Sequence, residues 1–390
     1  MMERILMLMI ETLKLKNFKA YKDQTFNFTN LTVFCGNNSV GKSTAVQAIG
    51  MFLQTNFLSG SSLKINGDLV HIGSVDDIHN YDRRKDDELL INISSSEFDA
   101  CWGYGKDGVI YRDNLPNKNE LPFIANEKTL HKLKFFSEKN FNFQYLDAER
   151  YGPRDNMPLS NHNYHQNWLG KQGEYTIEVL EGLFNKRLKL LNENSKNQED
   201  PRRHVNSSSA NVFQNIELWM QEISPGHKIL PRVENSANVA FNSIITEDGQ
   251  HTKPINIGFG YTYSLSIVSA LLLAEPNDLV VIENPEAHLH PRGQSYLGRL
   301  IALAAQAGIQ VIIETHSDHL LNGIRIISKI REGFSPELFT LYYISKDRDD
   351  TKVVKIDINN EGKLSEWPEG FFDQQSLDMY TLMTGMSPKN

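Results

Sequence analysis

One segment of the sequence has the residue types and the spacing of a phosphate-binding loop: a glycine, any four residues, and then Gly-Lys-Ser. Its members, with the threonine that follows, are Gly36, Asn37, Asn38, Ser39, Val40, Gly41, Lys42, Ser43 and Thr44. Glycines let backbone N–H groups wrap a phosphate chain, and a helix N-terminus adds partial positive charge. We therefore expect Lys42 to neutralise the β- and γ-phosphates of bound ATP, and the Ser43 hydroxyl to ligate Mg²⁺.

A second candidate is the carboxylate of Glu283, which follows the apolar run Leu279–Ile282. Phosphate-loop proteins hold Mg²⁺, usually through water, with a carboxylate at the end of such a strand. Taken alone, a surface carboxylate after a core strand is the more common explanation. Together with the loop at Gly36, the pattern favours Glu283 as a second Mg²⁺-binding residue.

These residues need particular elements to position them. The loop follows Leu31–Cys35, a continuous apolar run typical of a strand buried on both faces, and it precedes an expected helix at Ser43–Leu53. Apolar residues alternate with polar ones from Leu13 to Phe18 and again at Phe26 and Phe28, which predicts half-buried strands. Further short strands at 89–93 and 108–111 predict a small antiparallel layer beside the main sheet.

The rest of the chain divides into an α/β part and a polar region. We expect further strands at 141–146, 279–282 and 310–313, helices at 264–273 and 293–307, and a terminal hairpin of 338–345 with 352–356. Residues 156–235 are richer in Asn, Ser, Gln and charged residues, around expected helices at 175–191 and 212–223 and a mobile polar loop at 192–210. The predicted organisation is residues 1–155 and 236–390 as two parts of one domain, with 156–235 as an insertion.

Composition narrows the class of protein. The 390 residues are 40% hydrophobic and 23% charged, which is ordinary for a folded globular protein, and the formal net charge is −8. Contact with nucleic acid would therefore need a local basic face. Two cysteines, Cys35 and Cys101, are too few for a disulfide framework, and no apolar run reaches the ~20 residues of a membrane span. We predict a cytoplasmic protein with no membrane partner.

Several motifs together resemble one family. They are Asn17–Tyr21 ahead of the loop, Tyr145–Arg154, Glu283–Pro291 (Glu-Asn-Pro-Glu-Ala-His-Leu-His-Pro), Glu314–Ser317 (Glu-Thr-His-Ser) and Trp367–Asp373. In this order the chain resembles ABC-type ATPases of the SMC, RecF and OLD (overcoming lysogenization defect) group, within a bacterial subgroup associated with anti-phage defence. The resemblance implies an α/β fold: an SMC-head-like P-loop NTPase with a mixed central sheet, an antiparallel β layer and a helical insertion.

The same resemblance implies that the active site forms between two copies. In such a head-to-head dimer, the loop of one subunit faces a signature segment of the other, which here corresponds to Asn256–Thr262 with Gly258 and Gly260. A helix N-terminus after these glycines would suit a γ-phosphate clamp. The alternative is an ordinary glycine turn that caps the helix at 264–273. His316 corresponds to the switch histidine that holds the γ-phosphate.

The sequence departs from the family pattern at one position. The residue after the Mg²⁺ carboxylate is usually a glutamate that polarises the attacking water, and here it is Asn284. An amide orients a water but cannot take its proton. Glu286 is a candidate replacement base. We expect slow ATP hydrolysis, with Glu283, Asn284, Glu286 and His316 as the catalytic residues.

The expected partners follow from the resemblance and from what the chain lacks. Some OLD-type relatives continue into a Toprim nuclease, and the roughly sixty residues after Ile326 are too few for that unit. We therefore expect a regulatory ATPase of antiviral defence that controls a separate effector, such as a nuclease or toxin. The alternative is a RecF-like repair ATPase that binds DNA directly. For that role the basic residues of the insertion are the candidates: Lys186, Arg187, Lys189, Arg202 and Arg203.

Overall fold

The computed structural model describes residues 9–83, 88–105, 111–138, 141–160, 164–186, 188–191, 199–246, 248–331, 333–347, 350–368, 371 and 374–386. Its centre is a six-stranded mixed sheet in the order β18-β17-β3-β16-β15-β8. The strands are β3 (Leu31–Gly36), β8 (Phe143–Leu146), β15 (Leu279–Glu283), β16 (Gln310–Thr315), β17 (Phe339–Asp347) and β18 (Asp350–Ile356). All neighbours pair in parallel except β17 with β18, so the carboxyl ends of five strands meet at one edge.

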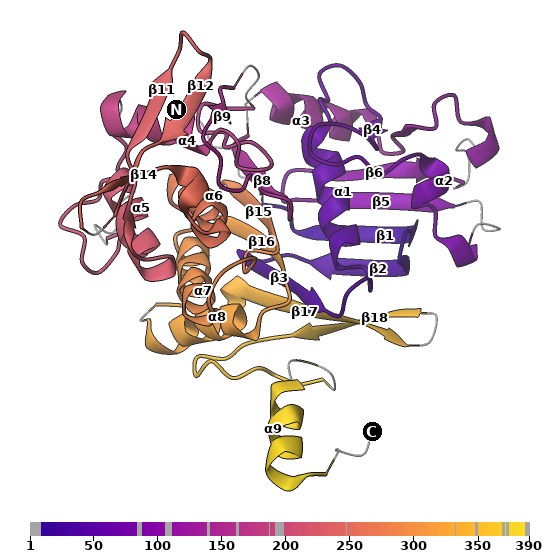
Figure 1. The fold of residues 1–390 in the computed structure, drawn as a ribbon. Coiled ribbons are helices and arrows are strands. Elements are labelled where there is room, and N and C mark those ends of the chain that lie inside the picture. The colour runs from indigo at the N-terminus through magenta and orange to yellow at the C-terminus, as the bar shows by residue number, and fades with distance from the viewer. Residues whose placement is uncertain are drawn as a thin grey trace.

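A four-stranded antiparallel sheet lies beside one face of the central sheet (Figure 1). It consists of β1 (Thr12–Phe18), β2 (Tyr21–Asn27), β5 (Leu89–Ser94) and β6 (Asp99–Tyr104), in the order β2-β1-β5-β6. Helix α1 (Lys42–Gln54) follows the loop after β3. It packs with apolar residues of both sheets in one buried hydrophobic cluster. The predicted antiparallel layer is confirmed. The fourth strand is β6, and most of the expected strand at 108–111 lies outside the described residues.

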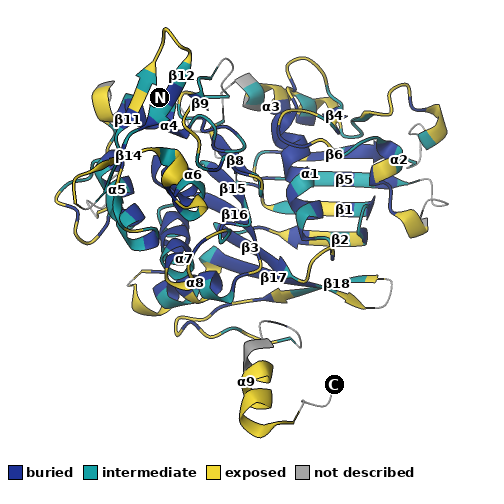
Figure 2. Ribbon diagram, viewed as in Figure 1, coloured by how far each residue is buried: buried dark blue, intermediate teal, exposed yellow. Residues whose placement is uncertain are grey.

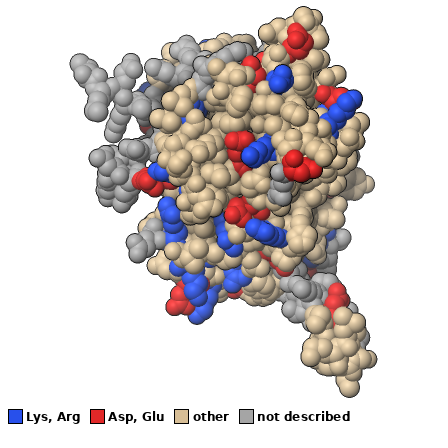
Figure 3. Space-filling view, turned by 60° about the vertical axis from the view of Figure 1, so that its left-hand side comes forward, with Lys and Arg blue, Asp and Glu red and all other residues tan. Residues whose placement is uncertain are grey.

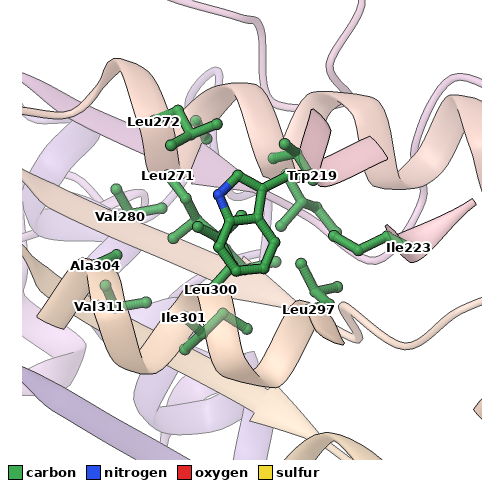
Figure 4. Close-up of a cluster of buried hydrophobic side chains, with 14 of the residues drawn as sticks. Trp219, Ile223, Leu271, Leu272, Val280, Leu297, Leu300, Ile301, Ala304 and Val311 are labelled. Atoms are coloured by element: carbon green, nitrogen blue, oxygen red, sulfur yellow. The ribbon is translucent and has the colours of Figure 1, made fainter. Parts of the chain in front are cut away.

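Helices cover the other face of the central sheet. They are α5 (Val212–Ile223), α6 (Phe259–Leu273), α7 (Pro291–Gln306) and α8 (Asp318–Ile330). Helix α5 of the polar region packs against α6 and α7, and Figure 4 shows Trp219 and Ile223 among Leu271, Leu297, Leu300 and Val311. These apolar side chains belong to one buried cluster that also includes β3 and β15. Residues of 156–235 therefore share a core with the central sheet.

Two expectations for residues 156–235 were wrong in detail. The predicted helix at 175–191 is shorter: α4 (Thr176–Glu181) continues as a π-helix over Gly182–Lys186 and ends there. The expected mobile loop at 192–210 is irregular over its described residues, 199–210, but several of its side chains are buried and anchor it. Arg202 is only 1% exposed, pairs with Asp200, and donates to the carbonyls of Leu271 and Ala274 at the C-terminus of α6. A cation at that end complements the helix dipole, which helps to fix the segment.

The remaining elements are short. They are β4 (Leu63–Lys64) with β7 (Glu120–Leu121), β9 (Met157–Pro158) with β11 (Pro231–Glu234) and β12 (Val239–Asn242), β10 (His227–Lys228) with β13 (Ile244–Thr246) and β14 (His251–Thr252), and helices α2 (Val75–Ile78) and α3 (Glu127–Glu138). The expected hairpin is present as β17 and β18. Beyond it, α9 (Gln374–Thr384) stands off the body and is exposed over its described side chains (Figures 1 and 2). Within the described part of the chain, no helix is both long and apolar enough to span a membrane.

Candidate functional site

The phosphate-binding loop joins the end of β3 to the start of α1, as the sequence predicted. Its backbone needs glycine at both ends. Gly36 has φ 143°, and a Cβ there would lie 1.9 Å from the Ile344 carbonyl oxygen of β17. Gly41, with φ 116°, is the N-cap of α1, and its carbonyl accepts a hydrogen bond from the Tyr21 hydroxyl at 2.8 Å. The loop is thus held by the neighbouring strand β17 and by Tyr21, the first residue of β2.

The side chain of Lys42 is buried against the phosphate-binding loop. Its Nζ donates to the carbonyl oxygens of Gly36 and Asn37, at 3.2 and 2.5 Å. Burial lowers the pKa of Lys42, and the carboxylate of Glu314 acts in the opposite direction. Lys42, Ser43, Glu314 and His316 line one pocket, together with Lys19, Ala20, Asn38, Ser39, Gly41, Thr44 and Gln47. A phosphate chain in this pocket would meet both the loop and the end of β16.

Lys19 is a pocket residue that sequence reasoning did not single out as a nucleotide contact. It has φ 47°, and its Nζ donates to Gln47 Oε1 of α1 at 2.6 Å. Burial lowers its pKa. The signal was present, because Lys19 belongs to the Asn17–Tyr21 motif ahead of the loop. The structure gives that motif a physical role, since it forms one wall of the pocket.

Glu314 is the second residue that sequence reasoning missed. The Ser43 hydroxyl donates to its Oε1 at 2.9 Å. The residue is 5% exposed, and its Oε2 has no hydrogen-bond partner among the described residues. Burial raises its pKa, against the hydrogen bond from Ser43 and the charge of Lys42. The sequence signal was only that Glu314 ends an apolar strand, two residues before His316.

Glu283 lies at the end of β15, directly opposite Glu314 in the parallel register. Its Oε1 accepts a hydrogen bond from the Tyr145 hydroxyl at 2.8 Å. Burial raises the pKa of Glu283 to about 7, and the neighbouring carboxylates of Glu314 and Asp147 act in the same direction. The structure therefore brings Ser43 to Glu314, whereas the predicted Mg²⁺ residue Glu283 is tied to Tyr145.

Asn284 begins the loop after β15 in a strained conformation. Its φ is 44°, in the left-handed region that asparagine tolerates better than most residues. Its N–H donates to the Glu314 carbonyl at 2.9 Å, and its buried Oδ1 has no partner in the described part of the structure. The amide thus has an unused acceptor.

Arg150 holds the start of the loop after β15 through hydrogen bonds to its backbone. Its guanidinium donates to the carbonyls of Asp147, Glu283 and Asn284, each at 2.7 Å, and lies 5.2 Å from the ring centre of Tyr263 on α6. Arg150 is 3% exposed, and burial lowers its pKa to about 10. From the sequence alone, an arginine at this place after a strand end could contact phosphate or a partner subunit, or lie in a solvated turn. It is instead a buried connection between the β8 turn, the β15 loop and α6.

Glu286, the candidate replacement base, has both carboxylate oxygens engaged. Oε2 accepts from the Thr315 hydroxyl at 2.8 Å, and Oε1 accepts from the His316 N–H at 2.7 Å. Glu286 thereby holds the loop that carries His316. The His316 side chain is exposed at the pocket. Partial burial lowers its pKa and the nearby Lys42 ammonium lowers it further, so the neutral ring is favoured.

The predicted signature segment forms the start of α6, which begins at Phe259 and thus five residues before the expected position. Gly260 lies inside the first turn, where a Cβ would be 2.5 Å from the His288 carbonyl oxygen. Contact with the loop after β15 thus explains this glycine within a single chain. Gly258 is the N-cap, and no described atom lies within 4 Å of its would-be Cβ.

The described side chains offer only part of the coordination shell that Mg²⁺ needs. No group of three His, Cys, Asp or Glu side chains among the described residues is placed to hold a metal ion by itself. The Ser43 hydroxyl and the unpartnered Oε2 of Glu314 belong to two side chains in contact and would be suitable oxygen ligands. Mg²⁺ in proteins commonly takes one or two such ligands plus phosphate oxygens and water. The residues present therefore fit the ion that the loop pattern implies.

The candidate basic residues in 156–235 are engaged within the chain where the structure describes their side chains. Arg202 is buried, Arg203 pairs with Glu199, and Lys189 pairs with Glu275. Arg187 and the side chain of Lys186 lie outside the described residues. On the face shown in Figure 3, positive and negative side chains lie side by side.

Comparison with known proteins gives matches over most of the chain. Residues 31–322 match a family model described as "AAA domain, putative AbiEii toxin, Type IV TA system", and residues 335–382 match a protein family of unknown function, DUF3696. A curated relative is the OLD nuclease of Thermus scotoductus, 22% identical over 372 residues, covering 89% of this chain and 64% of that protein. This chain thus spans less than two thirds of the relative's length.

Among solved structures, the SMC head domain from Thermotoga maritima is 13% identical with a TM-score of 0.45, covering 90% of this chain and all of that one. An SMC head bound to the C-terminal winged-helix domain of ScpA is 15% identical with a TM-score of 0.49, covering 89% and 97%.

Proposed function

We propose a function for this chain, which belongs to the AAA-domain family described as a putative AbiEii toxin of a type IV toxin–antitoxin system. It binds ATP with Mg²⁺ and hydrolyses the ATP slowly. It uses the bound nucleotide to control a separate effector. The observation that carries the proposal is the complete phosphate-binding loop between β3 and α1, which shares one pocket with Glu314 and His316. Loop, buried cation and helix N-terminus together suit a polyphosphate.

Each residue has a physical role in this proposal. Lys42, now bonded to two loop carbonyls, exchanges these partners for the β- and γ-phosphate oxygens. Ser43 and the strand-end carboxylates would hold Mg²⁺, which would supply charge neutralisation at the phosphates. His316 reaches the γ-phosphate as a neutral hydrogen-bond partner. Asn284 orients the attacking water through its unused Oδ1 but cannot accept a proton from it.

Slow hydrolysis is expected because position 284 carries no carboxylate and because Glu286 is already hydrogen-bonded. The usual general base is absent at position 284, and Glu286 already accepts two hydrogen bonds that fix the His316 loop. General bases typically contribute ~10²–10⁴-fold to a rate. A site without one favours long-lived bound ATP, which is suited to signalling. Steady-state phosphate release by the purified protein tests this; fast turnover would contradict it.

We also propose that two copies enclose ATP between the loop of one and the α6 N-terminus of the other. The open surroundings of Gly258 support this, because a phosphate group can approach the N-terminal N–H groups of α6 there. The proposed role in antiviral defence rests on the resemblance of the sequence motifs to a subgroup associated with anti-phage defence. A family described as a putative toxin of a toxin–antitoxin system supports control of an effector.

A protein partner is supported by the apolar side chains of the C-terminal helix. Exposed large residues on and after α9 are Leu377, Met379, Tyr380, Leu382, Met383 and Met386. An eleven-residue helix is marginal in water alone, so contact with another protein would stabilise it. The test is co-expression with the products of adjacent genes, followed by an assay of the effector's activity with and without ATP. Direct DNA binding by the RecF-like route receives less support, since three of its candidate residues, Lys189, Arg202 and Arg203, pair with carboxylates.

A further inference from the structure

The carboxylate nearest to the phosphate-binding loop is the one at the end of β16. The sheet order is β3-β16-β15, so β16 lies next to the loop strand and β15 is one strand further away. Neighbouring strands are about 4.8 Å apart. Glu314 is therefore one strand spacing from the end of β3, whereas Glu283, opposite it in the register, is two.

Contacts at the site agree with this order. Ser43, whose hydroxyl the loop pattern assigns to Mg²⁺, bonds to Glu314 at 2.9 Å. The carboxylate is 5% exposed and lines the loop pocket, yet its Oε2 lacks a partner in the described structure. A buried carboxylate oxygen without a partner is costly, and it points to a ligand that completes its coordination.

The negative charge of ATP indicates that the ligand of the Glu314 Oε2 atom is a cation. ATP brings several negative charges to a pocket where Glu314 already faces one buried cation, Lys42. A buried carboxylate beside phosphate oxygens is repelled by them unless a cation lies between. A divalent ion held by hydroxyl, carboxylate and phosphate oxygens removes the repulsion and is the oxygen-ligand set that Mg²⁺ prefers.

We propose that Glu314 is a Mg²⁺-binding residue of this site, acting with Ser43, in addition to the Glu283 that the sequence pattern indicates. In the structure the Ser43 hydroxyl donates to Glu314. With Mg²⁺ and ATP bound, both oxygens would turn to the ion. The proposal rests on the proposed function, because the ion arrives with the nucleotide.

The test separates a charged ligand from a neutral hydrogen-bonding group. Glu314→Gln keeps the shape of the side chain and resembles a protonated glutamate, but it carries no charge. ATP affinity is measured by calorimetry for the whole protein, once with EDTA and once with saturating Mg²⁺. The matched control is Asp278→Asn, an enclosed carboxylate just before β15, at the opposite end of that strand from Glu283.

The expected result is that Mg²⁺ tightens ATP binding at least tenfold in the wild type and in Asp278→Asn. In Glu314→Gln this gain falls at least tenfold, while affinity in EDTA stays equal or rises because a repelling charge is gone. Mn²⁺ retention in the presence of ATP, followed by electron paramagnetic resonance, should fall in parallel.

An unchanged Mg²⁺ gain in Glu314→Gln would overturn the inference and make Glu314 a neutral partner of Ser43. Should that variant not fold, Glu314→Asp asks the same question, because it keeps the charge but withdraws it by one methylene. A reduced gain there supports the inference and an unchanged gain contradicts it. Failure of the wild type to bind ATP at all would instead contradict the proposed function.

Discussion

Placing a carboxylate at Gly258 should block ATP-linked assembly without harming the single chain. Gly258 has φ −63° and ψ 147°, a conformation open to any residue, and its would-be Cβ meets no described atom within 4 Å. It is the N-cap of α6, where aspartate is favoured over glycine by only about a few tenths of a kcal/mol. The folded monomer of Gly258→Asp should therefore be as stable as the wild type.

The same carboxylate would face the γ-phosphate of the second subunit in the proposed dimer. Two unit charges about 5 Å apart repel each other by roughly 3 kcal/mol at an effective dielectric constant of ~20. Even half of this would weaken the dimer at least tenfold, since tenfold corresponds to about 1.4 kcal/mol. Sedimentation velocity with a non-hydrolysable ATP analogue measures the change.

Two variants act as controls for this experiment. Gly258→Ser adds a neutral capping side chain and should assemble like the wild type. Gly260→Ala adds no charge but places a Cβ 2.5 Å from the His288 carbonyl, so it should lower the thermal midpoint of the monomer. If Gly258→Asp assembles with ATP as the wild type does, α6 does not clamp the nucleotide of a partner and the reasoning is refuted.

Changes at four further positions test other parts of the site and one buried carboxylate outside it. Lys42→Ala should weaken ATP binding at least tenfold by calorimetry, because it removes the buried cation of the loop; wild-type affinity would exclude the assigned nucleotide site. Asn284→Asp and Asn284→Glu should each raise the rate of phosphate release at least tenfold, because they restore a general base. Asn284→Glu should also lower the free energy of unfolding by about 1 kcal/mol, because residue 284 has a φ of 44°. A fast wild type that neither change affects would show that another residue activates the water. Arg150→Met should destabilise the protein by about 3 kcal/mol in urea, since three carbonyls lose a charged donor; a change below 1 kcal/mol would mean that the loop holds itself. Burial raises the pKa of Asp278 to about 6, so the folded state binds more protons than the unfolded state between about pH 4 and 6, and stability falls as pH rises through that window; Asp278→Asn should lose this dependence in pH-resolved thermal melts, and an unaltered slope would contradict the assignment.

Much of the site could be predicted from the sequence, because its signals are local. The phosphate-binding loop is a continuous segment whose glycines, lysine and serine need only a strand before them and a helix after them. Both follow from the apolar run at Leu31–Cys35 and the helical pattern after it. For the same reason α5 was predicted with its observed bounds, Val212–Ile223, and the terminal hairpin was found as β17 and β18.

The tertiary structure decided which of these residues meet. Strand order is not encoded in local periodicity, and only the placement of β16 between β3 and β15 brings Glu314, rather than Glu283, to the Ser43 hydroxyl. Burial of long cations was equally hidden: Arg150 and Arg202 look like surface charges in the sequence but bond to backbone carbonyls in the interior. The need for glycine at position 260 could not be predicted from local sequence either. It arises from the close approach of the carbonyl of His288, which belongs to the loop after β15. Local patterns specify the elements and their chemistry, whereas contacts between distant segments depend on how those elements pack.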